Sequence, residues 1–138
     1  MRLTYHKKPI IIKRKRASDV PYEYEEQEML VEELRLRYPY LLFFHIANGD
    51  FRHISTANRL KDCGVRAGVP DLFFPALNLF IELKRQRSVA SQVSRSQKYM
   101  MKLLREAGYR CEVCYGAKES VNLIKEIMKT RQPNGNAI

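Results

Sequence analysis

Two short apolar runs, at residues 71–74 and 79–84, constrain the fold of this chain more than any other feature. Each run is too short for an ordinary helix and is rich in aromatic and branched side chains, which favours buried strands. Pro75 and Asn78 lie between the runs and suit a tight connection. The sequence therefore predicts a β-hairpin.

The second run carries two charged residues within its apolar sequence. Glu82 and Lys84 are two positions apart, so the alternation of side chains along a strand places both on one face, together with Phe80. Ile81 and Leu83 then point to the opposite face, toward the expected core. A lone Glu-x-Lys pair in a strand ordinarily belongs to a solvated face, so its meaning depends on what the hairpin brings beside Glu82.

A hairpin of this length brings Asp71, at the start of the first run, close to Glu82. Two carboxylates at short distance repel each other, and a shared cation is the usual relief. Oxygen ligands of this kind suit Mg²⁺ or Mn²⁺, which keep several waters and also bind phosphate oxygens. The pairing of Asp71 with Glu82 inside apolar runs therefore favours a metal-binding site over a solvated face.

Pro70-Asp71 and Glu82-Leu83-Lys84 resemble the two halves of the PD-(D/E)XK nuclease signature. The segments around them narrow the resemblance to the virus-type replication-repair nuclease (VRR-NUC) family, in particular its stand-alone phage-type members, over about residues 22–128. The one departure, Ala47 where these proteins often have proline, concerns loop geometry and not the chemistry. The segments that carry the resemblance are His45-Ile46-Ala47-Asn48-Gly49, Arg52, Arg59-Leu60-Lys61, the run from Gly64 to Leu72, Ser94-x-x-Gln97, Leu103-Leu104 and Gly108-Tyr109.

This resemblance implies metal-dependent hydrolysis of DNA and gives four residues a role in catalysis. Asp71 and Glu82 would hold Mg²⁺ or Mn²⁺ together with the backbone carbonyl of Leu83. Lys84 would orient or deprotonate the attacking water, or contact the scissile phosphate. Gln97 would hydrogen-bond to a water or a phosphate in the site.

The family also has a glutamate in the first helix that supports the metal site. Glu25, Glu26 and Glu28 compete for this role, and Glu26 is favoured because it lies four residues before Leu30 and extends the buried stripe of the helix. His45 is ambiguous, since a histidine on an apolar strand is more often a hydrogen-bonded core residue than a ligand or a base.

The remaining pattern predicts one α/β domain at 21–130, between a basic arm at 1–20 and a tail at 131–138. A hairpin followed by alternating helices and strands implies a mixed sheet flanked by helices, which fits the restriction-endonuclease-like core that the resemblance implies. The expected helices are 22–38, 55–62, 90–107 and 118–129, and the expected strands are 41–46, 71–74, 79–84 and 110–114.

A formal charge of +10 favours an anionic partner, with DNA as the first candidate. Residues 1–20 contain seven Lys and Arg against one acid, which fits either a solvated arm or additional phosphate contacts. Several tyrosines and a phenylalanine are candidates for stacking on unpaired bases: Tyr5, Tyr22, Tyr24 and Phe51. The candidates for contacts to the DNA backbone are Asn48, Arg52, Arg59, Lys61, Arg66, Arg85 and Arg87.

The three cysteines argue against a disulfide scaffold, because their number is odd. Cys111-x-x-Cys114 lacks a second half for a zinc or iron–sulfur site, and its surroundings favour a strand. No apolar stretch approaches the roughly 18 residues that span a bilayer, and the unpaired cysteines fit a cytoplasmic protein. The resemblance to phage-type members implies that the protein is encoded by a phage or prophage and acts in the bacterial host cell.

The sequence thus predicts a structure-specific endonuclease that cuts branched, flap or Holliday-junction DNA as a homodimer. Apolar and aromatic residues near the end of the first helix, namely Leu36, Tyr38, Tyr40 and Leu41, are candidates for the two-fold contact or for ordinary core. The alternative is a basic DNA-binding module on a nuclease fold that no longer cuts, and the complete acid–acid–lysine set favours the enzyme. An RNA-binding or RNA-cleaving protein is less favoured, because no RNA-recognition element is present.

Overall fold

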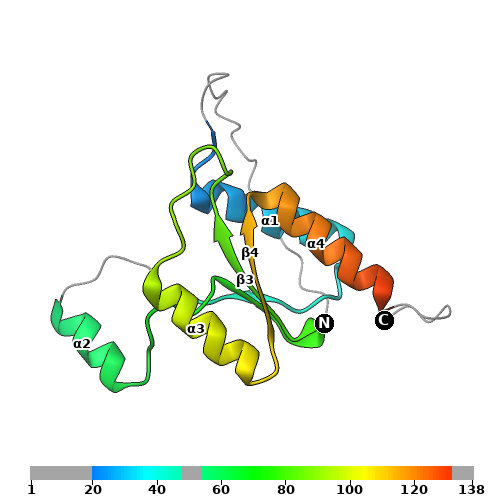
Figure 1. Cartoon of the computed structure of the whole chain (residues 1–138). Coiled ribbons are helices and arrows are strands. Elements are labelled where there is room, and N and C mark those ends of the chain that lie inside the picture. Colours follow the sequence, from blue (N-terminus) through cyan, green and yellow to red (C-terminus); the bar gives the residue numbers. More distant parts are fainter. Residues whose placement is uncertain (1–19, 48–53, 132–138) are drawn as a thin grey trace, which may run out of the picture.

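The computed structural model describes residues 20–47 and 54–131, which contain four α-helices, a short 3₁₀ helix and four strands (Figure 1). Nearly all of the expected basic arm and of the expected tail, and also Asn48-Gly49, for which the residue types favour a turn, lie outside these residues. In chain order the elements are α1 (Glu23–Arg37), β1 (Phe44–His45), α2 (Ile54–Asp62), β2 (Leu72–Phe74), η1 (Pro75–Leu77), β3 (Leu79–Lys84), α3 (Arg95–Glu106), β4 (Arg110–Tyr115) and α4 (Ala117–Thr130).

The strands form a mixed sheet in the order β1-β2-β3-β4. β2 and β3 are antiparallel with Leu72 opposite Ile81, and the connection runs through η1 to Asn78, whose φ of 47° is the left-handed conformation that asparagine tolerates. β3 and β4 are parallel, and α3 forms the crossover between them. The predicted hairpin and the predicted mixed sheet are therefore confirmed.

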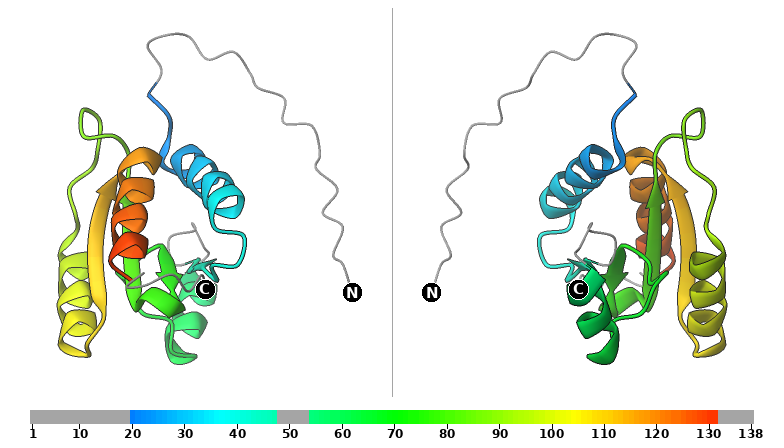
Figure 2. Two further views of the ribbon diagram at one scale, coloured as in Figure 1. Left: turned by 90° about the vertical axis from the view of Figure 1, so that its right-hand side faces the viewer. Right: turned by 90° about the vertical axis from the view of Figure 1, so that its left-hand side faces the viewer.

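Helices cover both faces of the sheet, as the two views of Figure 2 show. On one face, Leu30 of α1 and Ile124 of α4 pack with Ile81 of β3 in the larger apolar core. On the other face, Met101 of α3 packs with Phe80. β3 lies between these layers, and all six of its residues are buried.

Two elements differ from the sequence-based expectation. β1 is confined to Phe44 and His45, which pair with Phe73 and Leu72 of β2, whereas a strand at 41–46 was expected. α3 begins at Arg95 and not at about residue 90, because Ser94 caps it: the Ser94 hydroxyl accepts from the backbone N–H of Gln97, and the Gln97 side chain accepts from the backbone N–H of Ser94.

The two nearby cysteines lie on β4, as the sequence predicted. Cys111 packs in the core beneath α3, whereas Cys114 packs in the core beneath α1 and α4. They therefore face opposite sides of the sheet and do not share a site. In the part of the chain that the structure describes, no helix has both the length and the apolar character needed to cross a membrane.

Gly68 explains how the loop before β2 approaches α3. It has a φ of +84°, and a Cβ at this position would lie 2.3 Å from the backbone oxygen of Ser96 and 2.8 Å from the backbone nitrogen of Gln97. A side chain is therefore excluded by contact with backbone as well as by conformation. Glycine at this position lets the loop that carries Asp71 pack against the first turn of α3.

Alanine substitutions at two glycines separate these effects. Gly64 also has a positive φ, +97°, but nothing lies within 4 Å of its Cβ position. We expect Gly64→Ala to lower the free energy of unfolding by about 1–2 kcal/mol, from conformational strain alone. Gly68→Ala is expected to cost at least about 3 kcal/mol, since overpacking adds to the strain. Urea unfolding of both variants measures the difference, and equal losses would show that close packing against α3 is unimportant.

Candidate active site

Asp71 and Glu82 meet where the hairpin ladder ends. The last antiparallel pair is Leu72 with Ile81, and one further step along this register places Asp71 opposite Glu82. Asp71 Oδ2 accepts a hydrogen bond of 2.7 Å from the backbone N–H of Leu83. The Asp71 carboxylate thus takes the place of a backbone acceptor beyond the end of β2, and this bond fixes it beside β3.

The backbone of Asp71 is held from the other side by β1 and the residue after it. Its carbonyl oxygen accepts from the backbone N–H of Ile46 at 2.7 Å and lies 2.8 Å from Nδ1 of His45. Because a carbonyl only accepts, His45 Nδ1 carries the proton in this bond. His45 is exposed but hydrogen-bonded, and its contact positions Asp71, a role that its place in an apolar run did not reveal.

Gln97 joins Glu82 to Lys84. Its Nε2 donates to Glu82 Oε1 at 2.5 Å, and its Oε1 accepts from Lys84 Nζ at 3.2 Å. The Lys84 ammonium also lies 3.6 Å from Glu82 Oε1, and Glu82 and Lys84 are only 3% and 5% exposed. The structure therefore brings together the four residues that the sequence singled out for catalysis: Asp71, Glu82, Lys84 and Gln97.

Burial of the carboxyl groups changes their protonation. Burial, and then the charge of Asp71, raises the pKa of Glu82 from its ordinary 4.5 to about 8; Lys84 opposes this shift and Glu23 adds to it. Burial also raises the pKa of Asp71, against the lowering effects of the Leu83 N–H, of His45 and of Lys84. In metal-free protein the site therefore favours the protonated form of both carboxyl groups.

Glu23 is the first-helix glutamate that interacts with these carboxylates. Burial, and then the charge of Asp71, raises the pKa of Glu23. Glu23 was not among the sequence candidates, because they were ranked by the buried stripe of α1, whereas the site lies at the beginning of this helix. The signal that points to it is its position as the first residue of α1.

The glutamate that the sequence favoured for this role, Glu26, is buried as expected but binds elsewhere. Its Oε1 accepts from Gln86 Nε2 at 2.9 Å, and its Oε2 accepts from the backbone N–H of Ala117, the first residue of α4, at 2.8 Å. A carboxylate at a helix N-terminus stabilises that helix. Glu25 also has a structural contact, accepting from the backbone N–H of Tyr22. The contacts of Glu26 elsewhere, together with the charge interaction of Glu23 with Asp71, thus favour Glu23 over Glu26 as the support of the site.

The two arginines after Lys84 make contacts within the protein. Arg85 donates to the backbone carbonyls of Pro21 at 2.9 Å and Val20 at 2.7 Å, so it anchors the segment before α1. Arg87 pairs with Glu119 at 3.1 Å and lies over the ring of Tyr115. These contacts indicate structural roles, and phosphate binding by Arg85 and Arg87 stays a prediction.

The other candidate DNA-binding residues lie around α2, which projects from the body of the fold in Figure 1. Arg59 and Lys61 are exposed in its last turn, and Arg66 is exposed in the loop that follows. Asn48 and Arg52 lie outside the described residues.

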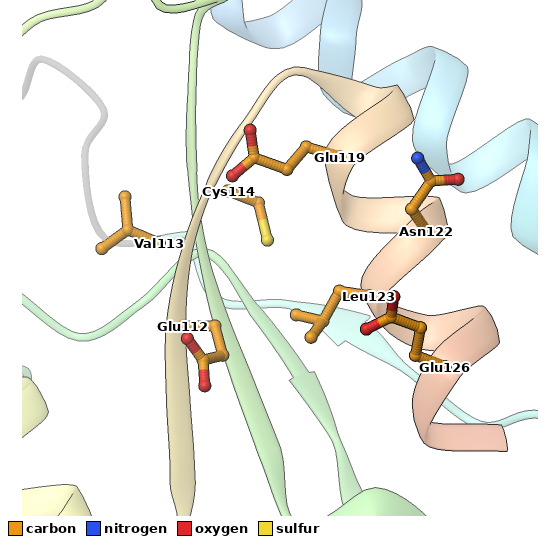
Figure 3. Close-up of a pocket in the computed structure, with 7 residues that line it drawn as sticks. All are labelled: Glu112, Val113, Cys114, Glu119, Asn122, Leu123 and Glu126. Carbon is orange, nitrogen blue, oxygen red and sulfur yellow. The ribbon is translucent and has the colours of Figure 1, made fainter. Parts of the chain in front are cut away.

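A cleft of about 240 Å³ lies between β4 and α4, away from the four candidate catalytic residues (Figure 3). Glu112, Glu119 and Glu126 contribute three carboxylates to its lining, and none of the four candidate catalytic residues lines it. Glu112 and Glu119 are paired with Arg110 and Arg87, and the cleft lies apart from the four candidate catalytic residues.

The donor set fits Mg²⁺ or Mn²⁺. Within residues 20–47 and 54–131, no three His, Cys, Asp or Glu side chains form a metal-binding group by themselves. Mg²⁺ does not require one, because it is usually bound by one or two carboxylates and keeps several waters. In an extended strand the N–H and C=O of one residue point to the same side, so the Leu83 carbonyl points toward the side on which its N–H binds Asp71.

The hairpin thus brings an acid just before its first strand beside an acid of its second strand, with a lysine two positions later, which is the arrangement that the sequence resemblance implies. The VRR-NUC domain family matches residues 21–118, and the chain belongs to this family. A solved structure described as a "VRR_NUC domain protein" has the same fold, with a TM-score of 0.65 and 22% identity over 80% of this chain and 91% of that one. A comparison with curated proteins finds no match.

The raised pKa of Glu82 predicts how stability depends on pH in metal-free protein. Folded Glu82 holds its proton more tightly than unfolded Glu82, so its contribution is complete below pH 4.5 and is lost as the pH rises through about 8. Asp71 and Glu23 shift in the same direction. Thermal unfolding in EDTA is therefore expected to shift by several degrees to lower temperature from about pH 5 to about pH 9. Glu82→Gln should remove most of this slope, and an unchanged slope would contradict the assignment.

Two glutamine substitutions distinguish the first-helix glutamates. We expect Glu23→Gln to reduce cleavage or metal affinity by about 10–100-fold with little change in stability, as for residues that support metal ligands. Glu26→Gln should instead lower the free energy of unfolding by about 1–2 kcal/mol, because it removes charge from the start of α4. Nuclease assays and chemical denaturation of both variants measure this contrast. The opposite pattern would restore Glu26 as the supporting residue.

Proposed function

We propose that this chain is a metal-dependent DNA endonuclease that hydrolyses phosphodiester bonds in branched DNA. The observation that carries the proposal is the meeting of Asp71 and Glu82 at the end of the hairpin, with the Glu82 carboxyl buried enough to raise its pKa to about 8. Burying two neighbouring carboxyl groups costs free energy when they are ionised, and groups with pKa values perturbed in this way are concentrated at functional sites.

Mg²⁺ or Mn²⁺ would be held by Asp71, Glu82 and the Leu83 carbonyl. When bound, such a cation polarises a phosphate, acidifies water and orients the attack. The cost of keeping these carboxyl groups ionised supports this assignment, because a bound cation would favour the charged forms that burial, and then the charge of Asp71, disfavour at Glu82.

Lys84 and Gln97 have complementary tasks in this proposal. Gln97 is fixed by the capping box of α3, so its amide sets the positions of both Glu82 and Lys84. The buried Lys84 ammonium supplies positive charge and donors for the attacking water or for the scissile phosphate. Gln97 adds hydrogen bonds without adding charge.

The substrate proposal depends on charge and size. The net charge of +10 favours DNA, and Arg59, Lys61 and Arg66 provide exposed cations for its phosphates. One domain of this size has little surface with which to grip the arms of a junction, so we propose that two copies act together and present one site to each of two strands. A flap or four-way junction offers the paired strands that this assembly requires.

Removing either carboxylate is expected to stop cleavage. Asp71→Asn and Glu82→Gln should each reduce the rate roughly a thousandfold or more, corresponding to about 4 kcal/mol of lost transition-state stabilisation, while DNA binding remains largely intact. Glu126→Gln, an exposed acid in the cleft beside α4, is the matched control and should cleave normally. Gel assays with Mg²⁺, Mn²⁺ or EDTA test this. Full turnover by both variants, or by wild type in EDTA, would favour the non-cleaving alternative or a different chemistry.

The assembly can be tested in solution. Light scattering at micromolar concentration is expected to give about twice the chain mass of 16.3 kDa. Of the candidate contact residues, Leu36 and Tyr40 are exposed, whereas Tyr38 and Leu41 pack against the core. Leu36→Glu should therefore dissociate the dimer without unfolding it. A wild-type monomer that cuts four-way junctions symmetrically would refute the premise, and a monomer that prefers flaps would indicate a single-cut nuclease.

A further inference from the structure

Two exposed tyrosines flank Glu23 at the beginning of α1. Tyr22 and Tyr24 are 60% and 63% exposed, and their rings are nearly parallel, with an interplanar angle of 6° and centroids 6.1 Å apart. Neither ring belongs to the two apolar cores of the described fold. The fold therefore presents two nearly parallel aromatic rings, each more than half exposed, at one place.

Arg85 fixes this pair beside the candidate active site. Its guanidinium lies 4.8 Å from the centroid of the Tyr22 ring, and its N–H groups are held by the carbonyls of Val20 and Pro21. Because Arg85 directly follows Lys84 at the end of β3, the Tyr22 ring lies close to the strand that carries Glu82 and Lys84. The backbone N–H of Tyr22 is also bound by Glu25, which limits movement of the segment.

We propose that Tyr22 and Tyr24 form a stacking surface for an unpaired nucleobase next to the scissile phosphate. This inference deepens the proposed nuclease function and rests on it, because it specifies the DNA at the cut: a strand whose bases are unpaired there, as in a flap or at a junction. Aromatic side chains stack on any base, since every base has a π-face, so the surface selects DNA structure and not sequence. In continuous duplex the bases stack on one another and do not offer a free face.

The proposal predicts a loss that depends on the DNA structure. Base–aromatic stacking contributes about 1–3 kcal/mol per base, which corresponds to roughly a 5- to 150-fold change in Kd. We expect Tyr22→Leu with Tyr24→Leu to weaken flap binding within this range and to leave binding to a duplex of equal length unchanged. Equal losses on both DNAs would overturn the proposal, as would no loss on either.

Tyr99 provides the matched control. It is 56% exposed on α3, and it lies two residues after Gln97, about 200° around the helix, so it points away from the sheet. Tyr99→Leu should bind flap and duplex as wild type does. Tyr24→Phe keeps the ring and removes the hydroxyl, so it should bind the flap as wild type does. If it does not, Tyr24 binds DNA through a hydrogen bond and not through stacking, and the proposal is overturned.

Binding is best measured in the Glu82→Gln background, where cleavage is not required. A flap carrying 2-aminopurine at the unpaired position beside the branch should change fluorescence on binding, and the double tyrosine variant should lose this change. The same variant should keep its melting temperature and its mass in light scattering, because both rings lie outside the cores. If the variant loses its fold or its assembly, the weaker flap binding results from a structural change or a lost protein contact, and the proposal is overturned.

The two proposals fail in distinguishable ways. If wild type cleaves no DNA with Mg²⁺ or Mn²⁺, the nuclease function fails, whereas the fluorescence of the Glu82→Gln protein still reports stacking. If wild type cleaves and the double tyrosine variant keeps its flap affinity and fluorescence change, stacking alone is refuted.

Discussion

The hydrogen bond from the Leu83 N–H to the Asp71 carboxylate is the interaction on which the site depends. β2 provides only three residues for pairing, so its ladder with β3 ends at the pair of Leu72 and Ile81. The next N–H of β3 that faces this side, that of Leu83, therefore needs another acceptor. The Asp71 side chain supplies it. The same bond holds this carboxylate opposite Glu82, so a requirement of the backbone adds the charge of Asp71 to the burial that raises the pKa of Glu82. The hydrogen bond between Leu83 and Asp71 therefore both completes the backbone pairing of β3 and positions a candidate catalytic carboxylate.

Three parts of the site contact one another: the loop with Gly68, the start of α3 with Ser94 and Gln97, and the Glu82–Lys84 pair of β3. Gly68 removes the side chain that would collide with the first turn of α3, and that turn carries Gln97. Gln97 both completes the capping box with Ser94 and binds Glu82 and Lys84. A change that moves the start of α3 therefore also moves the hydrogen bonds of the active-site pair. Gly68 and the Ser-x-x-Gln element therefore have one common role, which is to hold Gln97 in position beside Glu82 and Lys84.

Patterns local in the chain predicted most of the fold and the centre of the site. Period-2 alternation and a four-residue connection were enough to place Glu82 with Lys84 and to bring Asp71 beside them. The start of α3 was missed because apolar residues before Ser94 extend the helical pattern without forming the cap. Roles set by contacts between distant segments were also missed, since Arg85 reaches the backbone before α1 across more than sixty residues of sequence.

The first helix shows why periodicity alone could not choose among its glutamates. Successive residues of a helix point about 100° apart, so one acidic run reaches three environments: Glu23 interacts with the site, Glu25 holds the start of α1, and Glu26 holds the start of α4. Glu23, Asp71 and Glu82 gather three acidic groups at one place within a chain of net charge +10, and a bound cation would favour their ionised forms. Under the proposed function, the basic surface attracts DNA from a distance, while a scissile phosphate can approach these carboxylates closely only when a divalent cation has reversed the local charge. In this proposal the buried acids would both bind the metal and make productive contact with DNA depend on its presence.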